Sequence, residues 1–499
     1  MLLLVIRQET VGYYAANSVT TGNYNTAMGN EALEATTTGA YNTAIGMRAL
    51  EANTTAHANT AIGYQSLKAS TTAAYNTAVG YNALLAATTG GYNVSIGAYS
   101  LDAHTTGESN VAVGANALSA NTTATGNTAV GRQAAEANTT GHSNTAVGYL
   151  SLQDNTTGTY LTAIGAGALE DNTTAHYNTG VGFEALRKNT TGDQNTACGY
   201  QALTKNTTGQ HNTAFGLFAL KENTTGNYNT AVGQNALDAC TTSVSNTCVG
   251  RNAGGAITTG NGQNVCVGNN AAGAMTTGQQ NIIIGDNAGA GAAITGSLNT
   301  VVGDNAAYAL TTASSNVAIG PNSLGDTTTG GNNTAVGAKT MDRNTTGTNN
   351  VAVGYEALFH SDTGHATVAV GYRALYNVTG DRYNTAVGYD SMSSITSGYD
   401  NVSLGVNTLN TATTSYRSVA IGRDALDACT TGYNNTACGY HALKACTTGH
   451  RNQAYGDGCL DSLTTGERNI GIGNYAALGI TSGNYNVMIG QEAGSTCTT

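Results

Sequence analysis

The sequence predicts an all-β protein, a rod-shaped β-solenoid (β-roll) of about 29 coils, each of them seventeen residues long. The first observation is a repeat: the glycine of an NTAVG-like motif falls at Gly12, Gly29 and Gly46 and continues at this spacing to Gly490. The second is composition, because Gly and Asn separate short runs rich in Val, Ile and Thr, and the chain contains 1 Pro. Proline would remove a hydrogen-bond donor from any strand that it entered. Leucine-rich and helical-hairpin repeats are longer, at about 20 to 47 residues, so the observed period favours one solenoid coil.

The repeat leaves no room for separate domains. Two steps between anchor glycines are one residue longer than all the others, and both lie between Gly250 and Gly303. We therefore expect residues 1–499 to form a single continuous repeat domain with two one-residue insertions between residues 250 and 303. With one strand spacing of about 4.8 Å per coil, the coils would stack into a rod about 140 Å long.

Within each coil, positions are numbered from the anchor glycine, so that −1 precedes it and +4 is the fourth residue after it. Position −1 is Val or Ile in 23 of 29 copies, whereas position −2 is nearly always small. Because side chains alternate along a strand, we expect the −1 side chain to face the core and the −2 side chain to face a close neighbour. Position +4 is Leu in 19 copies, which predicts a second core ladder. Representative core residues are Val79, Val113, Leu84, Leu101 and Leu118.

Two further ladders mark the corners of the predicted coil. The anchor glycines form one, and Asn at +13, present in 25 of 28 full steps, forms the other. Asn accepts turn conformations, and stacked Asn amides can hydrogen-bond from coil to coil. The first clear members of this corner ladder are Gly29, Gly46, Gly63, Asn25, Asn42 and Asn59.

The NTAVG motif followed by an Ala-Leu pair resembles two groups of repeats. One is the head repeat of YadA-type trimeric autotransporter adhesins, and the other is the NTAxGxxAL tract of bacteriophage tail fibres. The resemblance covers nearly the whole chain and implies a β-roll. It also implies homotrimers, with the small side chains at position −2 as one candidate interface.

Composition excludes several function classes. Charged residues make up 9% of the chain and the net charge is −11, which argues against a nucleic-acid-binding surface. No apolar run of about 18 residues exists to span a membrane. The 9 His residues are scattered along the chain, with no more than two in any coil, whereas a metal site needs several convergent ligands. We therefore expect no cofactor, no metal and no enzymatic activity.

Cysteines and sequons suggest two covalent features. Cys429 and Cys446 occupy +7 of adjacent coils, so their Cα atoms would lie within disulfide range. The alternative, which we favour, is that Cys simply fits there as a small apolar residue. Six consecutive coils carry an Asn-Thr-Thr sequon at +7, which is a candidate for glycosylation, although a stacked Asn-Thr ladder is the simpler interpretation. These residues are Asn138, Asn155, Asn172, Asn189, Asn206 and Asn223.

The predicted function is that of a structural protein. We expect an extracellular fibre or filament, such as a surface filament or adhesin shaft, on a cell surface or virion. Self-association would be end to end or as a homotrimer, with cell-surface glycans as a further candidate partner for exposed Tyr residues. The main alternative is the trimeric shaft of a phage tail fibre. A minor alternative is an ice-binding solenoid that displays Thr ladders at −3, +8 and +9.

Overall fold

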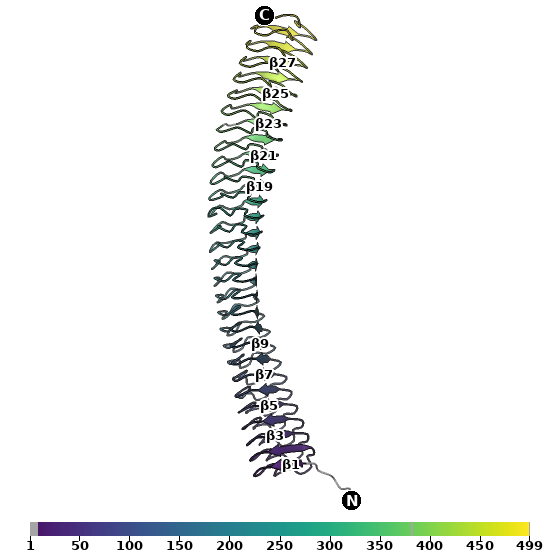
Figure 1. The fold of residues 1–499 in the computed structure, drawn as a ribbon, viewed down its shortest axis with the longest axis vertical. Helices are drawn as coiled ribbons and strands as arrows, with labels where there is room; N and C mark the ends of the chain where they lie inside the picture. The colour runs from purple at the N-terminus through teal and green to yellow at the C-terminus, as the bar shows by residue number, and fades with distance from the viewer. Residues whose placement is uncertain (1–7, 381–382, 499) are drawn as a thin grey trace. The chain divides into compact units, whose positions relative to one another are not determined.

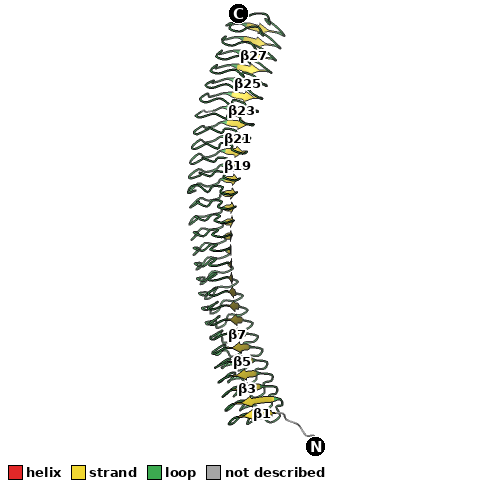
Figure 2. Cartoon of the chain, viewed as in Figure 1, coloured by secondary structure: helices red, strands yellow, loops and turns green. Residues whose placement is uncertain are grey.

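The computed structural model describes residues 8–380 and 383–498. These residues form an all-β parallel solenoid with one short strand per coil, which confirms the predicted fold class. Successive strands pair in parallel with a shift of one repeat, so that Thr43 lies beside Thr60 and Ile45 beside Ile62. Figure 2 shows the strands on one side of each coil and loops around the rest, and the described residues include no helix.

The coils fall into two compact units, Met1–Ser245 and Asn246–Thr499. Within each unit the strands stack one upon the next (Figure 1). The expectation of one continuous solenoid across both units stays a prediction. The strands of the first unit are β1 (Gln8–Val11), β2 (Asn25–Met28), β3 (Thr43–Ile45), β4 (Thr60–Ile62), β5 (Thr77–Val79), β6 (Val94–Ile96), β7 (Val111–Val113), β8 (Thr128–Val130), β9 (Thr145–Val147), β10 (Thr162–Ile164), β11 (Thr179–Val181), β12 (Thr196–Cys198), β13 (Thr213–Phe215) and β14 (Thr230–Val232). Those of the second unit are β15 (Thr247–Val249), β16 (Val265–Val267), β17 (Ile282–Ile284), β18 (Thr300–Val302), β19 (Val317–Ile319), β20 (Thr334–Val336), β21 (Val351–Val353), β22 (Val368–Val370), β23 (Thr385–Val387), β24 (Val402–Leu404), β25 (Val419–Ile421), β26 (Thr436–Cys438), β27 (Gln453–Tyr455), β28 (Ile470–Ile472) and β29 (Val487–Ile489).

The two insertions lie in the second unit and do not disturb the strand register. Thr247 still pairs with Val265, and Ile282 with Thr300, although each of these two coils is longer than its neighbours by one residue. The extra residue of each coil is therefore absorbed in the loops between the strands.

Backbone hydrogen bonds between coils continue around the loops. The Leu50 amide donates to the Ser66 carbonyl at 3.1 Å, and the Thr54 amide donates to Thr71 at 3.0 Å. The Arg48 amide instead donates back to Asn30 of the preceding coil at 2.9 Å. A buried backbone polar group must find a partner, and this network supplies partners that such short strands alone could not.

Left-handed backbone conformations recur at +2, +4 and +12 of each coil. In the coil that begins at Gly46, the φ angles of Arg48, Leu50 and Ala58 are 61°, 52° and 56°. Such angles are uncommon for residues with a Cβ and persist only where the surrounding structure fixes them. The repeated coil-to-coil bonds provide that constraint.

The anchor glycines of the predicted corner ladder are required for two reasons. Gly29, Gly46 and Gly63 have φ angles of 136°, 133° and 133°, which other residues rarely adopt. A Cβ on Gly29 would also lie 2.5 Å from the Gly46 carbonyl oxygen. Each anchor glycine therefore permits both the turn and the close approach of the next coil.

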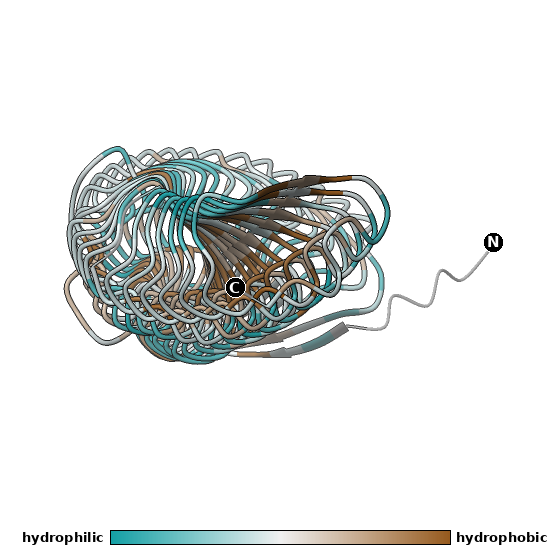
Figure 3. Ribbon diagram, turned by 90° about the horizontal axis from the view of Figure 1, so that it is seen from above, coloured by the Kyte–Doolittle hydropathy of each residue, from teal (hydrophilic) through white to brown (hydrophobic). Residues whose placement is uncertain are grey.

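The core of each coil is thin and is built from small strand residues facing larger loop residues. Leu84, Leu101 and Leu118 at +4 are fully buried, as are Ala78 and Ala112 in the middle of β5 and β7. Viewed along the stack, the apolar residues concentrate on the strands (Figure 3).

Candidate functional site

The outward face of the parallel sheet carries the large strand residues, which corrects the predicted orientation. Val79 and Val113 end β5 and β7, whose central residues are the buried ones, so both valines point outward and are partly exposed. The same holds elsewhere, since 37% of Ile62 and 40% of Ile96 are exposed. The buried side chains at position −2 accordingly offer no interface to a partner, contrary to the trimer contact that the resemblance implied.

Volume explains why the prediction was wrong. Position −2 faces position +4 inside the coil: a Cβ added to Gly289 at +4 would lie 3.3 Å from the Ile283 side chain at −2. Because packing density is nearly constant, Leu at +4 leaves room only for Ala or another small residue at −2. The largest side chains at position −2 are Ile283, Val301 and Met488, and each occurs where +4 is Gly or Ala. This covariation is visible in the sequence alone, and it identifies −2 as the core position.

The outward sheet face is also free of charge. From β2 to β29, positions −1 and −3 hold no Asp, Glu, Lys or Arg. Thr predominates at −3 and Val or Ile at −1, and some residues are strongly exposed, including Met28 at 45% and Leu404 at 49%. The exposed apolar row at −1 thus runs beside a row rich in Thr, and exposed apolar residues that lie together on a protein surface commonly mark an interaction site.

The Asn ladder at +13 joins coils through side chains, as expected. Asn25, Asn42 and Asn59 are buried. Asn25 Oδ1 accepts hydrogen bonds from the Asn42 amide at 3.0 Å and from Asn42 Nδ2 at 3.2 Å, and Asn42 Nδ2 also donates to the Ala56 carbonyl at 2.9 Å. The left-handed residue of this corner is at +12, such as Tyr24 with φ 60°, so the Asn acts as a hydrogen-bonding residue rather than the turn residue.

The Asn side chains at position +7 form a second Asn ladder inside the coil, which overturns the candidate glycosylation sites. Asn155 Nδ2 donates to Asn138 Oδ1 at 2.7 Å, and Asn172 Nδ2 donates to Asn155 Oδ1 at 2.9 Å. A glycosylated amide nitrogen must reach solvent, whereas these nitrogens are buried and bonded. The six Asn residues concerned are all fully buried, namely Asn138, Asn155, Asn172, Asn189, Asn206 and Asn223.

Six cysteines are buried, whereas Cys198 and Cys438 on the outward sheet face are partly exposed and Cys497 is exposed. Cys429 and Cys446 are both free and buried, so the structure does not contain the candidate disulfide. Their Sγ atoms lie 3.7 and 3.5 Å from the carbonyls of Gly432 and Gly449. The neighbouring Cys429 thiol, and then burial, raise the pKa of Cys446. Burial also raises the pKa of Cys240 to about 12, which keeps that thiol protonated and unreactive at neutral pH.

Aromatic residues on the corners stack along the coil axis. The rings of Tyr24 and Tyr41 lie 5.1 Å apart with planes at 12°. A longer stack places Tyr416 between Tyr399 and Tyr433 at 5.2 and 4.7 Å, and His450 continues it. Most ring faces of this stack are occupied by neighbouring rings, so its exposed edges are what a partner would meet.

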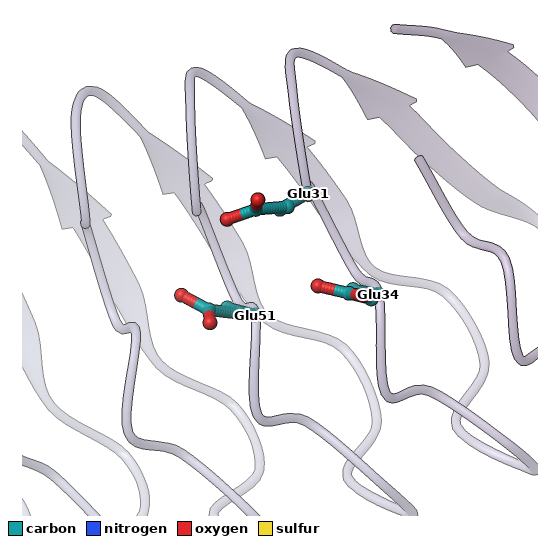
Figure 4. Close-up of side chains that lie close together, drawn as sticks. All are labelled: Glu31, Glu34 and Glu51. Carbon is teal, nitrogen blue, oxygen red and sulfur yellow. The ribbon is translucent and has the colours of Figure 1, made fainter. Parts of the chain in front are cut away.

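An acidic cluster lies on the corner of two neighbouring coils. Glu31, Glu34 and Glu51 place carboxylate oxygens within 4.8 Å of one another (Figure 4). Two cations of the chain offset part of its charge, since Arg48 Nε contacts Glu31 at 2.6 Å and Lys68 Nζ lies 3.6 Å from Glu51. Glu31 and Glu51 therefore belong to a ladder of ion pairs along the coil axis.

Shallow hollows indent the corner formed by positions +1 to +6. Three of them have a free volume between about 200 and 430 Å³, and two acidic residues line each of the three. The hollow beside Ala166 differs because two aromatic rings, Tyr149 and Phe183, border it.

Comparisons with protein-family models and with curated proteins find no match. Among the described residues, no helix has the length and apolar character needed to cross a membrane. The fold and its surfaces are therefore what supports a function for this chain.

Proposed function

We propose that the chain is a non-enzymatic structural protein that forms an extracellular fibre or filament on a cell surface or virion, as a surface filament or adhesin shaft. The observation that carries this proposal is the uncharged outward face of the parallel sheet, whose row of Val and Ile at −1 repeats from coil to coil in both units. The coils supply a regular framework, and the outward face supplies a surface for assembly.

A second copy of the chain is the partner that fits this face. Over the strands β2 to β14 of the first unit, the strip is about 60 Å long at the usual strand spacing and about 10 Å wide. Two such strips would bury about 1,200 Å² in total, the lower range of a specific interface. Only a partner with the same axial period can match the side chains of every coil, and another copy of this chain has that period.

The assembly has two forms that differ in the number of chains around the axis. Stacking of coils end to end gives a filament, whereas three copies joined by their outward faces give the trimeric shaft of a phage tail fibre. The resemblance to adhesin heads and tail fibres supports the trimer. Negative-stain imaging distinguishes them: long filaments with one chain per cross-section contradict the trimer, and short free trimers contradict the filament.

The assembly proposal is tested by placing charge on the outward face. We expect V79K/V113K to abolish lateral association, measured by analytical ultracentrifugation, because lysine ammonium groups would be desolvated in the interface. The matched control is T89K/T123K, which adds the same charge at exposed +9 positions. Equal association of wild type and V79K/V113K, with unchanged circular dichroism, would rule out this face as the interface.

Ice binding is a second candidate, and the position of the Thr residues favours one face for it. Thr at −3, such as Thr43 and Thr60, lies in register on the outward sheet face. Thr at +8 is less suited, because the Thr37 hydroxyl donates to the Thr54 carbonyl at 3.2 Å. Thermal hysteresis tests this candidate, and its absence at high protein concentration would remove it.

A further inference from the structure

The +1 positions form an interrupted ladder of aromatic rings along one corner. Where consecutive coils both carry a ring at +1, the rings stack: Phe183 and Tyr200 have centroids 5.2 Å apart and planes at 14°, and Tyr64 and Tyr81 lie 5.1 Å apart. Between Tyr149 and Phe183, however, the intervening coil carries Ala at +1. The four successive +1 positions from Tyr149 to Tyr200 therefore hold three aromatic rings, and Ala166 leaves a gap after the first of them.

The gap is an open slot rather than a site filled by neighbours. The coil of Gly165 is the only one in which +1 and +2 are both Ala or Gly, namely Ala166 and Gly167. A hollow of about 210 Å³ lies over them, bordered by the Tyr149 and Phe183 rings, which are 49% and 44% exposed. Two strand spacings separate these rings by about 10 Å, which leaves room for one planar group with a ring on each side.

The chain itself shows which group such a ring accepts. The Arg132 guanidinium, at +1 of the coil before Tyr149, lies 5.8 Å from the centre of that ring. Arg423 and Tyr440 repeat the arrangement at 5.9 Å. Cations within about 6 Å of an aromatic face are attracted by its quadrupole. Tyr149 also borders the slot, which lies on the side of the following coil, at Ala166.

The edge of the slot is acidic. Glu170 and Glu184 line it together with Arg187, which bonds their carboxylates at 2.9 and 3.1 Å. Two carboxylates against one guanidinium leave a net negative charge, and Asp171 follows directly in the sequence. A Cβ on Gly167 would lie 3.2 Å from Glu170 Oε2, so this oxygen borders the floor of the slot.

We propose that the slot between Tyr149 and Phe183 binds a small planar organic cation of the amidinium or guanidinium class. The two rings hold its faces, and Glu170 and Glu184 complement its charge. The hollow is smaller than the roughly 300 Å³ at which drug-sized ligand sites begin, so it accommodates one planar group. The slot lies at the corner and not on the outward sheet face, so its failure would leave the assembly proposal untouched.

Titration of the full chain with benzamidinium, followed by ligand-observed NMR, tests the slot. We expect saturable binding to the wild type and at least tenfold weaker binding to A166Y, because the new ring completes the stack. Tyr occupies +1 in nine other coils, so the substitution suits the fold. The matched control is A115Y, at the same position of a coil whose neighbours carry Ala98 and Arg132 at +1, and its binding should equal that of the wild type.

A neutral ligand and a second variant test whether binding depends on the positive charge of the ligand and on the open slot. Neutral benzamide, which has nearly the same shape, should bind at least tenfold more weakly than benzamidinium. A166R would place a guanidinium of the chain in the slot and should also abolish binding, which provides a second variant if A166Y folds poorly. The proposal is overturned if the wild type shows no saturable binding, if A166Y and A166R bind like the wild type, if A115Y loses binding equally, or if benzamide binds as tightly as benzamidinium.

Discussion

At the scale of single residues, the stability of the fold depends on buried amides and on partly buried carboxylates. An Asn amide at position +7 links three coils: Asn172 donates to Asn155 at 2.9 Å and accepts from Asn189 at 3.1 Å. Loss of the Asn172 side chain leaves the Ala175 carbonyl and one N–H of Asn189 without their partner, whereas Asn155 Oδ1 keeps its bond from the Gly158 amide. Each unsatisfied buried group costs about 1 to 3 kcal/mol.

Asn172→Ala should therefore lower the free energy of unfolding by about 2 to 4 kcal/mol, measured by denaturant titration. Asn172→Thr should lose less, because Thr327 occupies +7 naturally and donates to the Asn344 carbonyl at 2.8 Å. Thr174→Ala, at an exposed +9 position of the same coil, is the control. A loss of stability no larger for Asn172→Ala than for this control would contradict the role that we assign to the amide ladder.

Partly buried carboxylates predict an unusual pH dependence. Burial raises the pKa of Asp102, and burial together with Asp326 raises that of Asp342, above the ordinary 3.8. A raised pKa in the folded state favours the protonated form, so this stability is fully present below pH 3.8 and is lost as the pH rises through the folded pKa. Burial lowers the pKa of His360, which opposes the trend as the pH falls below that residue's ordinary value.

We expect D102N/D342N to raise the melting temperature at pH 7 and to flatten its dependence between pH 4 and pH 7. The gain should stay within about 1 kcal/mol per site, because the partly hydrated carboxylates are screened by solvent. Thermal melts over this range check it, with Glu108→Gln at an exposed corner as control. This assignment would be contradicted if lowering the pH from 7 to 5 reduced the melting temperature of the wild type as much as that of D102N/D342N.

At the scale of the strand, packing depends on a pair of facing positions rather than on hydrophobicity alone. Position −2 and position +4 share one core volume, so a large residue at one requires a small residue at the other. The natural pair of Ile283 and Gly289 shows the exchange directly, because a Cβ on Gly289 would lie 3.3 Å from the Ile283 side chain.

Ala44→Ile should destabilise the first unit by about 1 to 3 kcal/mol through overpacking, since Leu50 already fills the volume opposite. Adding Leu50→Gly should recover part of this loss, giving a favourable coupling in a double-mutant cycle. Denaturant titration of the two single variants and the double variant measures it. Additive effects of the two substitutions would show that the positions do not share a volume.

The sequence predicted the fold class and the ladders because both depend on period alone. The parallel register follows from the constant spacing of the repeat, and the +13 Asn bonds follow from stacking identical residues. It misplaced Val79 because the assignment assumed that the larger apolar residue of an alternating pair faces inward. That assumption fails in a coil so narrow that Leu84 nearly fills it. The slot at Ala166 was also missed, because it depends on a single exception to the +1 pattern rather than on the repeat.

At the scale of the whole molecule, each described coil within a unit bonds to the coils before and after it. The loss of local stability caused by a substitution should therefore be confined to a few coils, as in other solenoids whose stability is a sum of interactions between neighbouring repeats. Unfolding near a substitution can therefore be distinguished from unfolding of the whole unit by measuring coils far from the substitution.

Hydrogen exchange measured by mass spectrometry should show that Asn172→Ala increases exchange in the adjoining coils, which include β10 to β12, and leaves β3 to β5 unchanged. The expected reason is that the coils of β3 to β5 share no bonded neighbour with the altered one. Uniformly faster exchange across β3 to β14 would instead show that the first unit unfolds as one cooperative block.

The stacked anchor glycines set a rule for how such a chain can change in length. The anchor glycines of neighbouring coils approach so closely that a Cβ on Gly46 would lie 2.4 Å from the Gly63 carbonyl oxygen. Losing or duplicating one whole repeat unit brings two equivalent glycines together and restores every ladder, whereas removing half a unit would place side chains against backbone. The gain or loss of a whole repeat unit therefore lengthens or shortens the protein by whole coils and leaves the packing between coils unchanged in kind.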